Sequence, residues 1–192
     1  MEFEPIATER LVLRKLEARD RARLVQLANN WRVVKNLGTM PYPYTAAMAD
    51  EWIGKQAAFW ASGKSRPLAI TLDGELIGGI GVGTKPDRSD EEWELGYWLG
   101  EPYWNRGYAS EAAIAVRDDA FEAVGLSQII AGHYADNHAS GRVLTKLGFR
   151  YYAEAQRHCL ARGTNVRCLE MALPRARWSE IKAGVAREEL VA

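Results

Sequence analysis

Glu92-Trp-Glu-Leu-Gly-Tyr-Trp-Leu99 is followed by Trp104-Asn-Arg-Gly-Tyr-Ala-Ser110 and by a run that begins at Glu111, and these three segments decide the fold. The first has the composition of a strand and the second holds the glycine of a tight turn. The third predicts a helix, because small apolar residues recur at steps of three and four: Ala109, Ala112, Ala113, Val116, Ala120 and Val124. The first turn of a helix has N–H groups without intrahelical partners and carries the positive end of the helix dipole. Strand, turn and helix start therefore predict a site for phosphate, and Gly107 lets a ligand reach the amides.

This turn resembles the one that cradles the pyrophosphate of acetyl-CoA in the GNAT acyltransferases, where the usual pattern is Gln/Arg-x-x-Gly-x-Gly/Ala. Within that family it is similar to the bacterial ribosomal-protein N-acetyltransferases of the RimJ/RimL group. Gly107 and Ala109 match the pattern, Trp104 is a frequent first residue in that group, and Asn105 stands where glycine is commoner. The resemblance implies that the turn binds acetyl-CoA.

Two further segments match the same family in order and spacing. Thr8-Glu-Arg-Leu-Val-Leu-Arg14 lies near the start, and Asn137-His-Ala-Ser140, followed by Lys146-Leu-Gly-Phe149, lies downstream. A short glycine motif alone is weak support for a family, whereas three ordered segments joined by a compatible strand and helix pattern are strong support. The resemblance covers nearly the whole chain.

Length and composition bound the kind of protein. The 192 residues suffice for one well-buried core, so we expect one domain over 1–174 and a partly helical C-terminal tail over 175–192. Twenty-five basic residues balance 25 acidic ones without a basic run, which argues against nucleic acid as a ligand. No window approaches the roughly 18 apolar residues of a membrane span, and the N-terminus lacks a signal-peptide pattern. We therefore expect a cytoplasmic protein without a membrane partner.

The cysteine and aromatic content adds two expectations. Cys159 and Cys168 are the two cysteines and lack the clustering of a zinc site, so we expect reduced thiols and no metal, with a bridge between neighbouring strands left open. Seven tryptophans and eight tyrosines exceed what a small core easily hides, which indicates an aromatic groove or a subunit interface. Together with the habit of the family, this excess suggests a homodimer.

The apolar pattern predicts an α/β (α+β) domain with a mixed, mostly antiparallel sheet of about six to seven strands flanked by helices. The expected strands are 10–16 at one edge, 68–72 and 76–84 around an Asp73-Gly74 hairpin turn, 92–99, 127–134, 150–161 and 166–173. The expected helices run from Asp20 as N-cap towards Gly38 with a break at Asn29-Asn30, from Thr45 as N-cap to Trp60, over 108–124 and over 139–147. The crossover helix 108–124 makes strands 92–99 and 127–134 parallel. We expect the acceptor groove at the two N-terminal helices.

The resemblance implies a site between these parallel strands, which splay apart in the family so that the pantetheine arm lies in the gap. It places the backbone N–H of Leu99 at the thioester, where that donor stabilises the oxyanion that forms when an amine attacks the acetyl carbonyl. Asn137 matches the asparagine that holds the pantetheine amide and is equally suited to cap a helix. The residues implied to bind the cofactor are Leu99, Trp104, Asn105, Arg106, Gly107, Tyr108, Ala109, Ser110 and Asn137.

The reaction needs a base, because a typical alkylamine is protonated at neutral pH and only the neutral amine attacks. A carboxylate acting directly or through water supplies this function. Glu94 is our candidate, and period-two alternation places it on the same face of its strand as Trp98 and opposite Trp93 and Leu95. Glu92 is the substitute.

The leaving thiolate needs a proton. Many GNAT enzymes place a tyrosine seven residues after the asparagine that matches Asn137 for this purpose, but that position is Leu144 here. The similar ribosomal-protein acetyltransferases imply Ser140 as the acid instead. His133 and His138 receive no role, since a lone histidine is more often a surface or packing residue. Nothing in the sequence activates a cysteine thiolate, so direct transfer in a ternary complex is preferred over a ping-pong mechanism.

These observations predict an acetyl-CoA-dependent N-acetyltransferase that acts on a primary amine, either a protein N-terminus or a small-molecule amine. The alternative is a catalytically inactive protein of the same fold that binds acyl-CoA. It is supported by Leu144 in place of the tyrosine and by Asn105 in place of glycine. The identity of the acceptor stays open.

Overall fold

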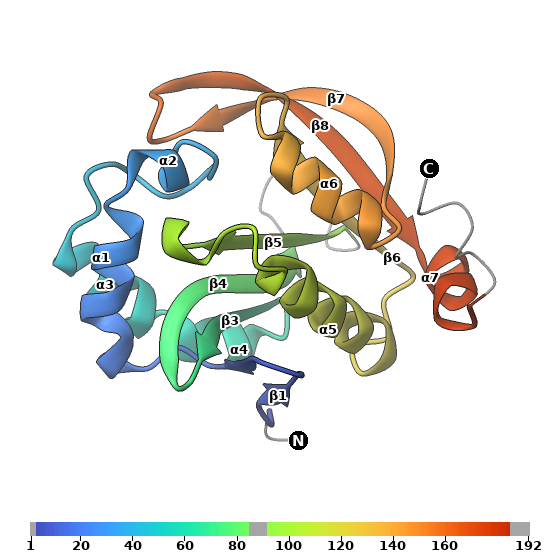
Figure 1. Cartoon of the computed structure of the whole chain (residues 1–192), viewed down its shortest axis with the longest axis horizontal. Coiled ribbons are helices and arrows are strands. Elements are labelled where there is room, and N and C mark those ends of the chain that lie inside the picture. Colours follow the sequence, from blue (N-terminus) through green and yellow to red (C-terminus); the bar gives the residue numbers. More distant parts are fainter. Residues whose placement is uncertain (1–2, 85–91, 185–192) are drawn as a thin grey trace.

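The computed structural model describes residues 3–84 and 92–184, which form one open sheet with helices on both faces (Figure 1). Within these residues the sheet has eight strands in the order β1-β2-β3-β4-β5-β6-β8-β7. The strands are β1 (Ile6–Ala7), β2 (Val12–Arg14), β3 (Ser65–Leu72), β4 (Glu75–Thr84), β5 (Trp93–Leu99), β6 (Gln128–Tyr134), β7 (Arg150–Cys159) and β8 (Thr164–Pro174). The helices are α1 (Arg21–Ala28), α2 (Trp31–Val34), α3 (Ala46–Gly54), α4 (Gln56–Ser62), α5 (Tyr108–Glu122), α6 (His138–Lys146) and α7 (Arg175–Lys182), with single 3-10 turns η1 (Ala18–Asp20) and η2 (Glu101–Tyr103). The predicted mostly antiparallel sheet flanked by helices is confirmed.

The parallel pair forms where the crossover helix predicts it. β5 pairs with β6 in parallel at one position, Glu94 opposite Ile130, whereas β4 and β5 pair antiparallel from Gly78 opposite Leu99 to Thr84 opposite Trp93. In the described part of the sheet, β5 and β6 therefore diverge beyond Glu94. The C-terminal half of β5 therefore has no ladder partner in β6 among the described residues, and we call the space between the two diverging strands the gap.

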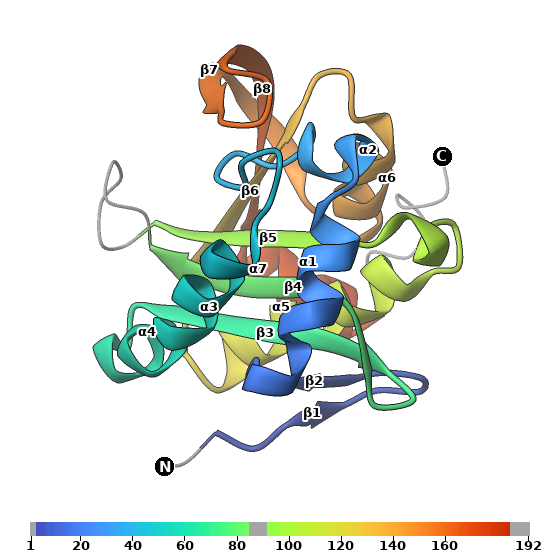
Figure 2. The same cartoon turned by 90° about the vertical axis from the view of Figure 1, so that its left-hand side faces the viewer.

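Side chains alternate between the two faces of the sheet. Leu68 and Ile70 of β3 join the larger core, whereas Ala69 between them joins the smaller one. Figure 2 shows α1 and α3 in front of the sheet and α5 behind it. Leu99 and Trp98 of β5 divide in the same way. The face that carries α5 and α6 is therefore separate from the face that carries α1 and α3, and β5 contributes side chains to both.

Helix α5 packs closely on the sheet because its inner face is small. The buried residues of that face are at most 3% exposed: Ala112, Ala113, Val116 and Ala120. Alanine at these positions lets the helix backbone approach the strands, so the turn that precedes α5 is fixed relative to the end of β5. The predicted small-residue face is confirmed.

Local turn and cap predictions are confirmed at three places. Asp73 and Gly74 both have positive φ, 51° and 83°, as a two-residue hairpin requires. Thr45 caps α3 by accepting a hydrogen bond from the amide of Met48 at 3.3 Å. The first helical region is interrupted between α1 and α2, at Asn29 and Asn30.

Two predictions at the N-terminal end need correction. The strand expected over 10–16 is shorter and is not at the edge, because Thr8 closes a turn onto Leu11 (Thr8 N to Leu11 O, 2.9 Å) and β1 adds the outer strand. Asp20 is the N-cap residue of α1 as predicted, but its side chain makes no capping hydrogen bond, since both its oxygens accept hydrogen bonds from Arg14 at 2.7 Å. Burial raises the pKa of Asp20, but the bonds from Arg14 and from the Glu17 amide lower it by more.

The helix expected from Thr45 to Trp60 is two helices, α3 and α4, joined at Lys55. In the region of the predicted tail, α7 packs on the domain, with Trp178 stacked on Phe121 at 4.9 Å between ring centroids, while 185–192 lie outside the described residues. Cys159 and Cys168 are buried and form no disulfide. None of the helices in 3–84 and 92–184 is both long and apolar enough to cross a bilayer.

Candidate active site

The turn between β5 and α5 exposes backbone amides at the start of a 15-residue helix. Gly107 is the N-cap residue with φ 83°, and no side chain caps the helix. Asn105 also has positive φ, 59°, a conformation that asparagine tolerates better than most residues, so the turn forms without the glycine that is commoner at this position. Asn105, Arg106 and Gly107 are exposed. The first-turn amides, including those of Ala109 and Ser110, therefore begin the helix without a side-chain cap beside an exposed turn, an arrangement that suits an anion.

The N-terminal segment braces this turn. Arg10 donates from Nη1 to the carbonyl of Arg106 at 3.0 Å and from Nε to Glu111 Oε2 at 2.7 Å, and its guanidinium lies over the Tyr108 ring at 4.6 Å. Thr8 Oγ1 donates to Glu111 Oε1 at 2.6 Å. Burial raises the pKa of Glu111, but Thr8 and Arg10 lower it by more, so the carboxylate in the first turn of α5 is charged and paired. Thr8 and Arg10 of this motif thus shape the turn. Sequence reasoning missed this role of Arg10, although the motif itself pointed to the segment.

The loop after β5 is held from two sides. Trp104 Nε1 donates to the carbonyl of Leu99 at 2.8 Å, which ties the turn to the end of the strand. On the other side, Asn30 Nδ2 donates to Glu101 Oε2 at 2.6 Å, and Arg32 pairs with the same carboxylate. Trp104, predicted to bind the cofactor, is therefore positioned to fix the geometry of the turn.

Leu99 presents its backbone to the gap between β5 and β6. The amide of Gly100 donates to the carbonyl of Ile77 in β4 at 2.9 Å. Because alternate residues of a strand point their N–H groups to opposite sides, the N–H of Leu99 points away from β4. Its side chain is buried, at 6% exposure. The sequence-predicted backbone donor therefore faces the gap.

Asn137 and Ser140 lie on the far side of the gap, at the start of α6. The Oδ1 of Asn137 accepts from the amide of Ser140 at 3.3 Å, which confirms the predicted cap. The hydroxyl of Ser140 lies 3.0 Å from the hydroxyl of Tyr97, which comes from β5 two residues before Leu99. Burial raises the pKa of Tyr97 to about 12. The structure thus joins α6 to β5 across the gap through a tyrosine that sequence reasoning did not single out.

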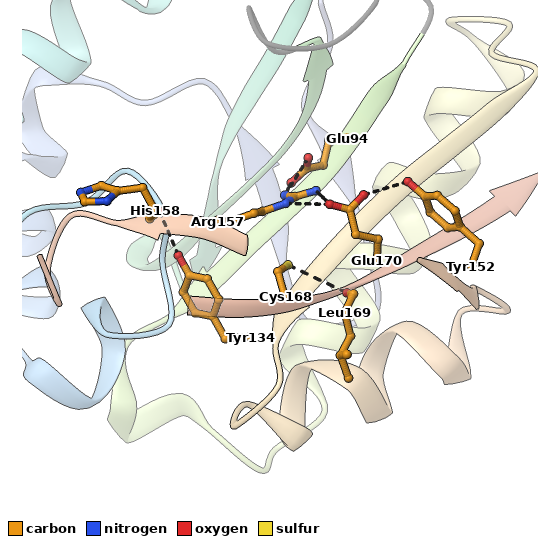
Figure 3. A network of polar contacts seen from close by, with 8 residues as sticks. All are labelled: Glu94, Tyr134, Tyr152, Arg157, His158, Cys168, Leu169 and Glu170. Carbon is orange, nitrogen blue, oxygen red and sulfur yellow. Dashed lines mark hydrogen bonds and ion pairs between the residues drawn. The ribbon is translucent and has the colours of Figure 1, made fainter. Parts of the chain in front are cut away.

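Glu94 belongs to an ion network on the face of the sheet opposite to Tyr97 and Ser140 (Figure 3). Its Oε1 and Oε2 accept from Arg157 Nη1 at 2.8 and 3.1 Å, and Arg157 donates from Nε and Nη2 to Glu170 Oε1 at 3.0 and 2.9 Å. Tyr152 donates to Glu170 Oε2 at 2.8 Å. Burial lowers the pKa of Arg157, but the two glutamates raise it by more, so the guanidinium stays charged. This network links β5 to β7 and β8, and no spacing of residues in the sequence predicts it.

The two residues predicted to transfer protons, Glu94 and Ser140, lie on opposite faces of the sheet near the start of the gap. Glu94 lies on the face that carries α1 and α3, whereas Ser140 lies on the face that carries α5 and α6. Glu92 precedes β5 outside the strand. His133 is buried, with Nε2 3.0 Å from the hydroxyl of Tyr151, and His138 is exposed at the first position of α6. An acyl group in the gap would have a carboxylate on one side and a hydroxyl on the other.

Comparisons with known proteins identify the family. The model described as "Acetyltransferase (GNAT) domain" matches residues 10–150. The uncharacterized N-acetyltransferase YoaA of Bacillus subtilis (strain 168) is 29% identical over 164 residues, which cover 84% of this chain and 92% of that protein. The acetyltransferase structure from Agrobacterium tumefaciens strain C58 is 29% identical, with a TM-score of 0.73 over 91% of this chain and 96% of that one. Mycobacterium smegmatis RimJ in complex with CoA-disulfide shares the fold at 23% identity, with a TM-score of 0.77 over 94% of this chain and 93% of its own. Since the family model matches well over half of this chain, the chain belongs to the GNAT acetyltransferases.

Proposed function

We propose that the protein is an acetyl-CoA-dependent N-acetyltransferase that transfers an acetyl group to a primary amine by direct attack in a ternary complex. One observation carries this proposal: the uncapped N-terminus of α5, with Gly107 at φ 83°, lies directly after the strand beside which the sheet opens. This arrangement suits a ligand that has an anionic group for the helix start and an extended arm for the gap. Acetyl-CoA has both features and supplies an acetyl thioester.

The binding residues divide by the part of the ligand they suit. The amides from Gly107 to Ser110 would hold the pyrophosphate, with Arg106 adding a solvent-exposed charge. The backbone of Leu99 would pair with the pantetheine arm as a neighbouring strand does. Asn137 caps α6 with its Oδ1 and retains its amide group for the same arm. Only Arg106 among these contributes a side-chain charge.

The chemistry requires a donor at the carbonyl and two proton transfers. The N–H of Leu99 stabilises the oxyanion that develops as the amine nitrogen bonds to the acyl carbon. Glu94 accepts the proton of the amine, directly or through water, and Ser140 donates a proton to the sulfur as the carbon–sulfur bond breaks. The acceptor approaches from the face of Glu94, where α2, α3 and their linker expose Trp31, Tyr42 and Trp52 at 44%, 48% and 39%.

The description of one structural neighbour supports a proposal for the acceptor class. One structural neighbour is described as a ribosomal L7/L12 alpha-N-protein acetyltransferase in complex with coenzyme A. A protein N-terminus is therefore one acceptor that we propose, and a small-molecule amine is the other. To test the function, CoA binding is measured by calorimetry and CoA release is followed over a panel of peptides with free N-termini, polyamines and amino acids. Absence of CoA binding in folded protein would overturn the proposal.

A second candidate is a protein that binds acyl-CoA without turnover. It is favoured by the Arg157 guanidinium, which engages both oxygens of Glu94, and by Leu144, which has no proton to donate. The two candidates differ in their dependence on Glu94. If the protein is an enzyme, Glu94→Gln lowers the rate by about a hundredfold or more at unchanged CoA affinity. If no amine in the panel releases CoA from wild-type protein that binds it, the second candidate stands.

We also propose a homodimer through the edge of the sheet at β7. Tyr151 and Tyr152 of this strand are 54% and 53% exposed, more than large aromatic side chains usually are in a monomer. Light scattering at micromolar concentration tests this, and a monomeric mass would contradict it.

A further inference from the structure

The Tyr97–Ser140 contact allows two arrangements of hydrogens. The hydroxyl of Tyr97 lies 3.0 Å from Ser140 Oγ and 3.2 Å from the carbonyl oxygen of Ser140. A phenol has one hydrogen, so Tyr97 donates either to the carbonyl, with Ser140 donating back to Tyr97, or to the hydroxyl oxygen. Only the second arrangement leaves the hydrogen of Ser140 free to point elsewhere.

Two features favour the second arrangement. The hydroxyl contact is the shorter one, and the carbonyl of Ser140, in the first turn of α6, is also an acceptor for the helix backbone. Tyr97 is moreover held in place, because its strand pairs with β4 at Ile80 and its ring packs against the larger core. A fixed phenol that donates to Ser140 Oγ directs the serine hydrogen away from itself. The gap beside Leu99 is the space next to this pair.

We propose that Tyr97 is a positioning residue that orients the Ser140 hydroxyl towards the leaving thiolate and restores its proton. This inference rests on the proposed acetyl transfer. When the carbon–sulfur bond breaks, sulfur keeps the electron pair and takes the hydrogen of Ser140, whose oxygen takes the hydrogen of Tyr97. Tyr97 regains a proton from water, which receives the one lost by the amine through Glu94. The net change is one proton moved from the amine to the thiol.

The chemical state of Tyr97 suits this role. Burial raises the pKa of Tyr97 to about 12, so the phenol is protonated at every pH at which the enzyme would be assayed. Leu144, one turn further along α6, is buried and carries no exchangeable hydrogen. Ser140 alone would have its hydroxyl hydrogen free to rotate, whereas the bond from Tyr97 restricts it to directions away from β5.

The test compares Tyr97→Phe, Ser140→Ala and the double variant, with Tyr134→Phe as the matched control. Tyr134 is a buried tyrosine of β6, and its hydroxyl donates to the carbonyl of His158 in β7 at 3.2 Å. We expect Tyr97→Phe to lower kcat about tenfold and Ser140→Ala about a hundredfold, with the KM for acetyl-CoA within about twofold of wild type in both. Tyr97→Phe should add nothing in the Ser140→Ala background, since Tyr97 acts through Ser140. Tyr134→Phe should lower thermal stability as Tyr97→Phe does, but not kcat.

Each outcome decides the inference. An unchanged kcat for Tyr97→Phe, or losses that multiply in the double variant, would overturn it. If Tyr97→Phe does not fold, the rates of wild type and Ser140→Ala in mixtures of light and heavy water decide: a curvature in wild type that Ser140→Ala lacks supports the relay, and the same dependence in both overturns it. Failure of wild-type protein to bind CoA would instead overturn the proposed function, so the two failures are distinguishable.

Discussion

The turn before α5 and the network around Arg157 lie at the two ends of the same strand, yet they are built in opposite ways. The turn leaves the first amides of a long helix without a side-chain cap, and Arg10 holds the turn by donating to the carbonyl of Arg106. The network does the reverse, because the guanidinium of Arg157 is shared between two carboxylates whose side chains are only 10% and 6% exposed. The helix start therefore has no side-chain acceptor from the protein, whereas the charges of the network are paired within the protein.

This difference separates binding from stability. A site of backbone amides depends on conformation, so most side chains around it can change as long as Gly107 keeps its positive φ. A buried ion network depends on the side chains themselves, and removal of one charge exposes the rest to a desolvated surrounding. We therefore expect the turn to control CoA affinity and the network to control folding and the acceptor side of the reaction.

The largest effect should follow Arg157→Met. Without the guanidinium, Glu94 and Glu170 are two partly buried carboxylates on one face, and we expect a loss of about 3–5 kcal/mol in the free energy of unfolding, measured by urea denaturation. The control is Arg167→Met on the same hairpin, because Arg167 and Glu154 form an ion pair with side chains 59% and 56% exposed. That variant should lose at most about 1 kcal/mol. Equal losses would show that the network is no more than a surface pair.

The next effect should follow Gly107→Val. A branched side chain at φ 83° distorts the turn, and its Cβ would lie 3.2 Å from Arg10 Nη2. Loss of two or three charge-assisted bonds, each worth roughly 1.5–3 kcal/mol, should weaken CoA about a hundredfold or more by calorimetry.

Gly125→Val is the matched control for that variant. Gly125 follows the other end of α5 with φ 82° and has open space around it, so valine there suffers the same backbone strain. Its melting temperature should fall while its CoA affinity stays within about twofold of wild type. Equal CoA affinity for Gly107→Val and wild type would move the cofactor site elsewhere.

A smaller effect is expected for Arg106→Ala. The side chain is exposed and the backbone amides remain, so CoA affinity should fall by less than about fivefold at low salt. At about 0.5 M salt the difference from wild type should nearly vanish, because the remaining attraction is screened. A loss as large as that of Gly107→Val would assign the binding energy to side-chain charge instead of the backbone.

The smallest effect is expected for Asn105→Gly. Glycine adopts the φ of 59° without strain but has more freedom in the unfolded chain, so stability should change by no more than about 0.5 kcal/mol and CoA affinity should not change. Asn105→Val should cost about 1–2 kcal/mol in a thermal melt, since a branched residue does not tolerate positive φ. A similar response to glycine and valine would contradict the left-handed turn.

Local features were within reach of the sequence. The small-residue face of α5, the Asp73-Gly74 hairpin, the break between α1 and α2 and the Asn137 cap depend on residues within a few positions of one another. Periodicity and turn chemistry act over that range, so they show in the order of residues alone. The edge position of the first strand and a cap by the Asp20 side chain were mispredicted for the opposite reason. Thr8 bonds to Leu11 and Arg14 bonds to Asp20, and the local pattern of residues does not show these contacts.

By itself, the sequence determined the kinds of element, the crossover that makes β5 and β6 parallel, and the glycine turn that starts α5. Only the tertiary structure decided the partners of the reactive groups. Glu94 meets Arg157 63 positions away, and Tyr97 meets Ser140 43 positions away. These pairs exist because β7 and β8 fold back beside β6 and because α6 begins where the sheet opens. Strand order is set by the burial of whole faces, and a side chain's partner follows from that order, which no spacing along the chain contains.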